Sequence, residues 1–156
     1  MHLCAQGFRA PRNAAIRPKN KFIEVPAMKL QPDRLDVQSI VGYGPGWIGL
    51  SSNGLPEKIE RSIVIGSHGE KFAWNCPRIE DLSEEHFNRL ITTKPELVIF
   101  GSGTRLRFVP PAMLRGLMQH RIGVETMDTL AACRTYNILA GEGRRVIAAL
   151  LIETGT

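Results

Sequence analysis

Residues 97–153 alternate short apolar runs with amphipathic segments, and this alternation is the most informative pattern in the chain. The runs at 97–100, 122–126 and 144–153 have the length of strands. Between them, residues 110–120 and 128–139 space their apolar side chains as helices do. This order of strand, helix, strand, helix and strand is typical of a largely parallel sheet with helices packed on it.

The N-terminal half, residues 34–75, has the pattern of short strands. Strands are predicted at 35–43, 47–50, 60–65 and 71–74, with turns at 44–46 and 67–70. Because the connections are short, these strands should form an antiparallel meander. The predicted fold is a single α/β domain with a mixed sheet, a β-rich antiparallel N-terminal half, a C-terminal β-α-β-α-β half, and helices packed on the sheet.

Three helices have recognisable ends. Ser83 is a good N-cap, Leu82 and Phe87 have the spacing of a hydrophobic staple, and the helix should end at residues 94–95. The second helix should begin at Pro111. The third has Asp128 as its predicted N-cap. The third helix should end at Gly141 or Gly143. Four apolar side chains of the second helix should fall on one face: Met113, Leu114, Leu117 and Met118.

The charge of the chain lies mainly in its first residues. Residues 1–27 hold five basic residues and one acidic residue, whereas residues 28–156 hold 15 basic and 14 acidic residues. The first segment is predicted to be a disordered basic tail, and 28–156 to be the single α/β domain. The tail is open to three interpretations: a segment upstream of a true start at Met28, a flexible basic arm, or an acid-poor transit peptide.

The spacing of the cysteines and histidines argues against a CxxC site and a zinc site. The three cysteines form no CxxC pair, and the four histidines have no zinc spacing. Free thiols favour a reducing compartment, so we expect a cytoplasmic protein, or a mitochondrial one if the source is eukaryotic. No run approaches the roughly 18 apolar residues of a membrane-spanning helix. We therefore expect no metal, no cofactor and no membrane insertion.

A glycine loop follows the strand at 97–100. The backbone N–H groups of Gly101, Ser102, Gly103 and Thr104 are candidates for an anion-binding nest, to which Arg105 and Arg107 would add charge. The alternative is a tight turn at the end of a strand. A dinucleotide fingerprint would require a third glycine where Leu106 stands, and no P-loop lysine follows.

Other polar side chains are candidates near this loop. Glu125 and Asp128 form a carboxylate pair suited to acid–base chemistry or a metal, but Asp128 is also a helix cap, and Glu125 has Arg105 or Arg144 as ion-pair partners. Cys133 is a candidate nucleophile with Asn137 one turn later, although no histidine is placed near it. A buried cysteine, and an amide that ties the helix to a loop, are the structural alternatives.

Trp47 and Trp74 are expected in the core. The turn Gly44-Pro45-Gly46 still leaves Tyr43 or Trp47 available for a partner. Both tryptophans therefore have a structural interpretation, and only Trp47 has a functional one.

Several motifs in order resemble a known family. They are Trp47 to Leu50, Ser62 to Val64, Trp74-Asn75, Gly101 to Thr104, Val124 to Leu139, and Glu142 to Leu150. Over residues 30–153 the chain resembles the family of small α/β domains that includes the third human mitochondrial complex I assembly factor, an adipogenesis-associated homologue, and many short bacterial and archaeal proteins. The block 124–139 is its most specific part. The resemblance implies this fold, no established enzymatic activity, and, in mitochondrial members, an accessory role in assembling complex I with a partner factor.

Three functions remain open from the sequence. The first is a non-enzymatic accessory or interaction protein that binds another protein through the cleft around residues 101–105 and the start of the third helix. The second is a binder of, or an enzyme acting on, a small anionic ligand in the same crevice. The third is nucleic-acid binding through the basic tail, although no specific nucleic-acid motif is present. No catalytic constellation is recognisable, so the sequence favours a role without catalysis and does not decide the question.

Overall fold

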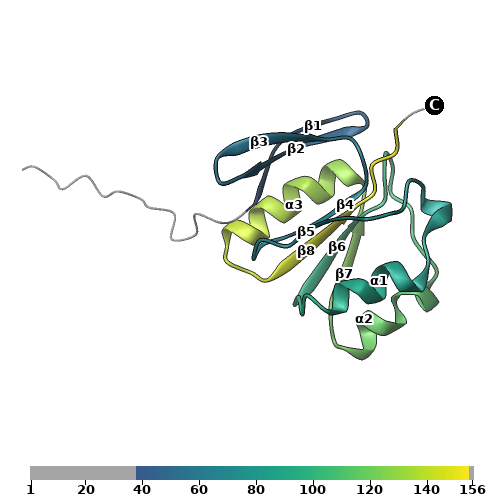
Figure 1. Ribbon diagram of the computed structural model, residues 1–156. Helices are drawn as coiled ribbons and strands as arrows, with labels where there is room; N and C mark the ends of the chain where they lie inside the picture. The colour runs from purple at the N-terminus through teal and green to yellow at the C-terminus, as the bar shows by residue number, and fades with distance from the viewer. Residues whose placement is uncertain (1–37, 155–156) are drawn as a thin grey trace, which may run out of the picture. The chain divides into compact units, whose positions relative to one another are not determined.

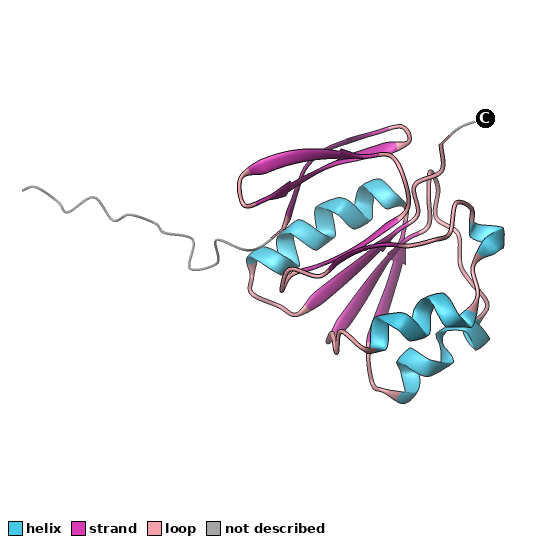
Figure 2. Cartoon of the chain, in the orientation of Figure 1, coloured by secondary structure: helices cyan, strands magenta, loops and turns pink. Residues whose placement is uncertain are grey.

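The computed structural model describes residues 38–154. The tail 1–27, the start at Met28 and the nucleic-acid hypothesis that depends on the tail lie outside these residues. The elements follow in the order β1 (Ser39–Gly44), β2 (Trp47–Ser52), β3 (Leu55–Ile59), β4 (Ile63–Gly66), β5 (Lys71–Ala73), η1 (Ile79–Asp81), α1 (Glu84–Ile91), β6 (Leu97–Gly101), η2 (Pro111–Leu114), α2 (Arg115–Gln119), β7 (Gly123–Met127), α3 (Thr129–Gly141) and β8 (Val146–Leu150). Figures 1 and 2 show their arrangement.

A five-stranded mixed sheet forms the centre of the domain, in the order β5-β4-β8-β6-β7. Strand β6 runs parallel to both of its neighbours, β7 and β8, whereas β4 runs antiparallel to β8 and β5. The chain passes from β6 to β7 through α2 and from β7 to β8 through α3, and these helices lie on opposite faces of the sheet (Figure 1). The predicted β-α-β-α-β half is confirmed.

Alternating side chains of the central strands pack into two separate hydrophobic cores, one on each face of the sheet. In β6, Ile99 faces α3 whereas Val98 and Phe100 face α1 and α2. Strand β8 alternates in the same way, with Ala148 on the α3 side and Ala149 on the other. A strand buried on both faces reads as a continuous apolar run, which is why β6 and β8 are easy to find in the sequence.

A second sheet, β1-β2-β3, covers α3 on the side away from the central sheet (Figure 1). Both of its strand pairs are antiparallel. The Tyr136 hydroxyl of α3 donates to the Gln38 carbonyl at 2.9 Å. The Asn137 amide accepts from the Ile40 N–H at 2.9 Å and donates to the Ile40 carbonyl at 2.7 Å. Asn137 thus occupies the backbone N–H and carbonyl that Ile40 would offer to another strand at the outer edge of β1.

The Trp47 ring explains why β1 has glycines at positions 42 and 44. Its ring lies where the side chains of Gly42 and Gly44 would be, so a Cβ at either glycine would contact the indole. On the same face, Lys58 Nζ lies 5.6 Å from the centre of the Trp47 ring. The absence of side chains at Gly42 and Gly44 therefore leaves room for the Trp47 ring.

The predicted helices are confirmed with two differences. Ser83 and Asp128 precede α1 and α3 as N-caps, and Leu82 and Phe87 are buried. The second helix is a four-residue 3-10 turn followed by the five-residue α2, so its side chains are spaced differently from those of a continuous α-helix. Leu117 is fully buried whereas Met118 is 59% exposed, so the two do not share one face as predicted. Among residues 38–154, no helix is both long enough and apolar enough to cross a bilayer.

Candidate functional site

A cleft of about 180 Å³ opens at the carboxyl end of the parallel strands. We call it the carboxyl-end cleft. The helices that follow the adjacent strands β6 and β7 lie on opposite faces of the sheet, and such a switch point is where open α/β sheets hold ligands. Its lining comes from four segments: the hairpin turn and start of β2 (Gly44, Pro45, Gly46, Trp47, Ile48), the glycine loop (Gly103, Thr104), the first turn of α3 (Thr129, Leu130) and the segment after β8 (Leu151, Ile152, Glu153).

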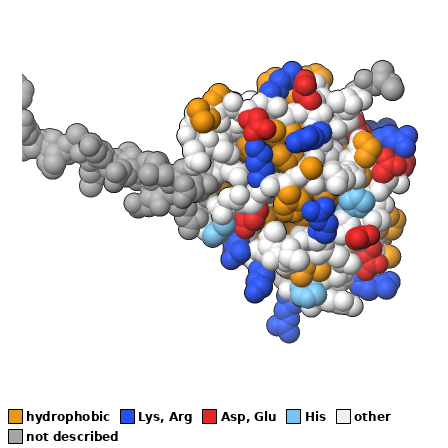
Figure 3. Space-filling view, viewed as in Figure 1, with side chains coloured by type: hydrophobic (Ala, Val, Ile, Leu, Met, Phe, Trp, Pro, Cys, Tyr) orange, Lys and Arg blue, Asp and Glu red, His pale blue; other side chains and the backbone are white. Residues whose placement is uncertain are grey.

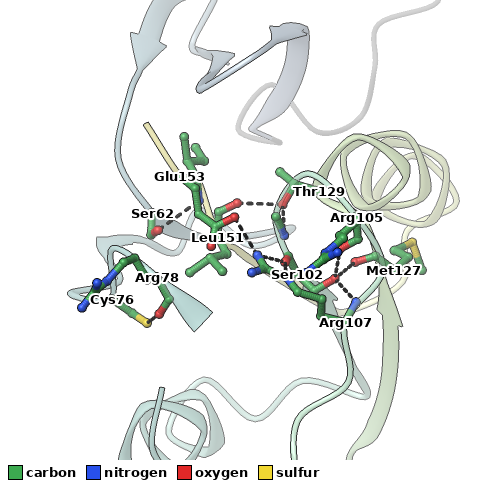
Figure 4. A network of polar contacts seen from close by, with 12 residues as sticks. Ser62, Cys76, Arg78, Ser102, Arg105, Arg107, Met127, Thr129, Leu151 and Glu153 are labelled. Carbon is green, nitrogen blue, oxygen red and sulfur yellow. Dashed lines mark hydrogen bonds and ion pairs between the residues drawn. The ribbon is translucent and has the colours of Figure 1, made fainter. Parts of the chain in front are cut away.

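The glycine loop is bound tightly to the start of α3 (Figure 4). The Gly103 N–H donates to Thr129 Oγ1 at 2.9 Å, and Thr129 Oγ1 donates in turn to the Leu151 carbonyl at 2.7 Å. The Ser102 N–H donates to the Met127 carbonyl at 2.8 Å. Two of the N–H groups considered for an anion nest are therefore already used inside the protein.

Arg107 also has internal partners. Its Nη2 lies 2.6 Å from the Ser102 carbonyl and 2.6 Å from Glu153 Oε2, and its side chain is only 20% exposed. A Cβ on Gly103, which has a φ of +97°, would collide with this pair. Arg107 thus fastens the segment after β8 to the glycine loop and is not available to a ligand. Arg105, by contrast, is exposed and enters the network in Figure 4 through its carbonyl, 2.9 Å from Ser102 Oγ.

The two candidate carboxylates, Asp128 and Glu125, have different environments. Asp128 Oδ1 accepts from the Ala131 N–H at 2.9 Å and caps α3. Glu125 is exposed on the edge strand β7. Neither Arg105 nor Arg144, the two partners considered for Glu125, forms an ion pair with it among the described residues, and Arg144 Nε lies 2.6 Å from Glu96 Oε1. Within residues 38–154, no group of three or more His, Cys, Asp or Glu side chains is placed to hold a metal ion.

Cys133 and Asn137 lie away from the cleft lining. Cys133 lies on α3, where it is fully buried, and burial raises the pKa of its thiol to about 12. A thiol in that state is a poor nucleophile at neutral pH. Asn137 binds β1, as described above. The structure therefore brings Gly103 and Thr104 into the cleft lining, with Asp128 next to Thr129 in the chain. The other predicted cleft residues do not line it: Gly101, Ser102, Arg105, Glu125, Cys133 and Asn137.

Sequence reasoning missed most of the cleft wall. Residues 44–48 and 151–153 approach the glycine loop only through the fold, and no local pattern links them. The one available signal is the turn Gly44-Pro45-Gly46, which had suggested that Trp47 is accessible to a partner. Trp47 is half-buried and lines the cleft.

Comparison with known proteins gives consistent matches. The family described as "Protein of unknown function (DUF498/DUF598)" matches residues 40–151. NADH dehydrogenase (ubiquinone) 1 alpha subcomplex assembly factor 3 of Bos taurus is 39% identical over 84 residues, which cover 53% of this chain and 46% of that protein. The chain thus spans about half the length of the curated relatives it matches.

Solved structures from bacteria share the fold. A crystal structure of a Bordetella parapertussis protein is 34% identical, with a TM-score of 0.68, and the match covers 76% of this chain and 98% of that one. A solution structure of a Bordetella pertussis protein described as a Mth938-like domain is 27% identical, with a TM-score of 0.66, and the match covers 76% and 88% of the two chains.

Proposed function

This chain belongs to the DUF498/DUF598 family, and from that premise we propose that it is a non-enzymatic accessory protein that binds another protein through the carboxyl-end cleft. One observation carries the proposal. The cleft is open and walled by large apolar side chains, and two of its polar side chains, Thr129 and Glu153, are already paired inside the protein. Such a surface suits the side chain of a protein partner.

The relatives support an accessory role. The bovine relative is named as an assembly factor of NADH dehydrogenase, and an assembly factor acts by binding other proteins. Because this chain spans about half of that relative, a role in assembly belongs to the proposal and is not transferred with the name. A cytoplasmic location, or a mitochondrial one in a eukaryotic source, is part of the same proposal, and the free thiols of Cys76 and Cys133 support it.

The chemistry of the cleft favours binding over catalysis. Among the described residues that line it, Glu153 is the only one with a titratable side chain, and that carboxylate is paired with Arg107. General acid–base catalysis needs a titratable group within reach of the substrate and free to exchange its proton. The anionic ligand considered from the sequence is less well supported, because the Ser102 and Gly103 N–H groups and the Arg107 guanidinium are already bonded.

Affinity capture from a native lysate of the source organism tests the proposal. The bait is the full tagged chain, beside an Arg105→Glu variant and an Arg115→Glu variant as the matched control, since Arg115 is exposed on α2 on the other face of the sheet. We expect a protein that is retained by the wild type and Arg115→Glu, and lost from Arg105→Glu. Capture of the same proteins by all three baits, or small-molecule turnover that depends on Asp128 or Cys133, would contradict it.

A further inference from the structure

We infer that the partner fills the carboxyl-end cleft with one large apolar side chain and places a carboxylate next to it. This inference rests on the proposed function and specifies the chemistry of the partner. It follows from the size of the cleft, from its internal hydrogen bonds and from the charges around its mouth.

The size of the cleft fits one side chain. Its volume is about 180 Å³, and an apolar cavity of about 150 Å³ is known to accept a benzene molecule. Apolar side chains dominate its walls: Trp47, Ile48, Leu130, Leu151 and Ile152. An aromatic ring or a branched aliphatic group therefore fits, and a folded domain or a long chain segment does not.

Two polar side chains of the cleft already have internal partners, which favours an apolar anchor. Thr129 Oγ1 donates to the Leu151 carbonyl and accepts from the Gly103 N–H. The Glu153 carboxylate is paired with Arg107. A polar group entering the cleft would lose its water and gain little in return, whereas an apolar group gains from the same transfer.

Exposed apolar side chains continue from the mouth along α3. Leu130 and Ile138 lie two turns apart on α3 and are 38% and 61% exposed, and Tyr43 of β1 is 39% exposed. Between them, Arg134 Nη1 lies 3.2 Å from the Tyr43 hydroxyl, with its guanidinium 5.9 Å from the centre of the Tyr43 ring. The Asn137 amide already occupies the backbone N–H and carbonyl of Ile40, so a partner strand cannot pair with β1 at that residue.

The charges at the mouth favour a carboxylate. Asp128 and Glu153 are committed to the Ala131 N–H and to Arg107. Within residues 38–154, neither Arg105 nor Arg134 forms an ion pair with a carboxylate. Basic, acidic and hydrophobic side chains lie next to one another on the face shown in Figure 3. Both guanidinium groups therefore lack a carboxylate partner among the described residues and can pair with acidic residues beside the anchor, although Arg134 also donates to the Tyr43 hydroxyl.

Three ligands that share one ring and differ in charge test this chemistry: 3-indolepropionate, indole and tryptamine. Each is titrated into the full ¹⁵N-labelled chain and followed by amide chemical shifts. We expect shifts at Trp47, Gly103, Thr104 and Leu130, with 3-indolepropionate binding about two- to fivefold more tightly than indole at low salt, and tryptamine most weakly.

Variants distinguish the contribution of the indole ring to binding from the contribution of the carboxylate charge. Arg105→Gln and Arg134→Gln should each reduce the preference for 3-indolepropionate and leave indole binding unchanged, whereas Arg115→Gln should change neither. The inference is overturned if indole leaves the cleft resonances in place, if tryptamine binds as well as 3-indolepropionate, if inorganic phosphate gives the larger shifts, or if the same resonances move on concentration alone, which would indicate a second copy as the occupant.

The two proposals fail in different ways. A protein captured through Arg105 without any indole binding in the cleft would leave the proposed function standing and overturn the chemistry given to the partner. Indole binding in the cleft without a captured protein would overturn the proposed function.

Discussion

The two tryptophans of the described chain occupy contrasting environments. Trp74 is 1% exposed and packs edge-on against Phe87 and Phe100, with ring centres 5.7 Å and 5.8 Å away. Trp47 is half-buried, lies on the glycines of β1 and lines the carboxyl-end cleft. Both rings are held in place by their surroundings, but Trp74 is almost fully covered, whereas Trp47 is partly exposed to solvent.

This contrast separates stability from binding. An edge-to-face aromatic cluster between a sheet and two helices stabilises the fold and offers no surface to a partner. A large aromatic ring fixed beside an open cleft costs little conformational entropy when a partner covers it. We therefore expect substitutions at the closed cluster to change the free energy of unfolding, and substitutions at the cleft to change binding.

Removing the two rings should have the largest and most unequal effect on stability. Trp74→Ala should lower the free energy of unfolding by about 3–5 kcal/mol, because it empties a fully buried site. Trp47→Ala should cost less, because that ring is partly exposed and already keeps part of its surface in water. Urea unfolding of both variants measures the difference, and equal losses would contradict the division into a closed cluster and an open cleft.

Gly101→Ala tests how closely α3 approaches the central sheet at the cleft. The new Cβ would lie 3.1 Å from the Thr129 Cα and 3.1 Å from the Ala132 Cβ, so α3 must move away from β6. We expect a loss of about 1–3 kcal/mol in the free energy of unfolding. Gly141→Ala is the matched control, because nothing lies within 4 Å of its new Cβ, and its stability should be equal or slightly higher. Equal losses in both would show that the close packing at Gly101 is unimportant.

The smallest expected effect is on the rate at which the two buried thiols, Cys76 and Cys133, are alkylated. Burial raises the pKa of Cys76 from 9.0 to about 11 and that of Cys133 to about 12. At pH 8 the thiolate fraction of Cys76 should be about a hundredfold below that of a thiol at its ordinary pKa, so alkylation should be slower by at least that factor. The folded state holds these protons more tightly than the unfolded state, so the stability that this provides is present below pH 9 and is lost as the pH rises toward 11.

Alkylation is best followed in a Cys4→Ser variant, because Cys4 lies outside the described residues. Mass spectrometry counts the labelled thiols in native protein and in urea. Rapid labelling of Cys76 or Cys133 in native protein at pH 8 would contradict the closed packing around both.

The sequence predicted the parts of the fold that depend on local patterns. The apolar runs of β6 and β8 and the cap at Asp128 each lie within a few residues of chain. Strand β3 was missed because four of its five residues are exposed and its composition is polar. The separation of β1, β2 and β3 into their own sheet depends on α3, roughly 90 residues away, through contacts such as Asn137 with Ile40. The same holds for the cleft, whose walls come from segments with no local relation to one another.

Site-specific photocrosslinking in living cells of the source organism tests the central claim most directly. A photoreactive leucine analogue is placed in the full chain at Leu130, which lines the cleft, or at Met118, which is equally apolar and 59% exposed on α2. We predict that the analogue at Leu130, and not at Met118, joins a partner protein at a large apolar residue with Asp or Glu close by in its sequence. Equal crosslinking from both positions, or crosslinks from Leu130 only to a second copy of this chain, would contradict the claim that the carboxyl-end cleft receives a protein partner.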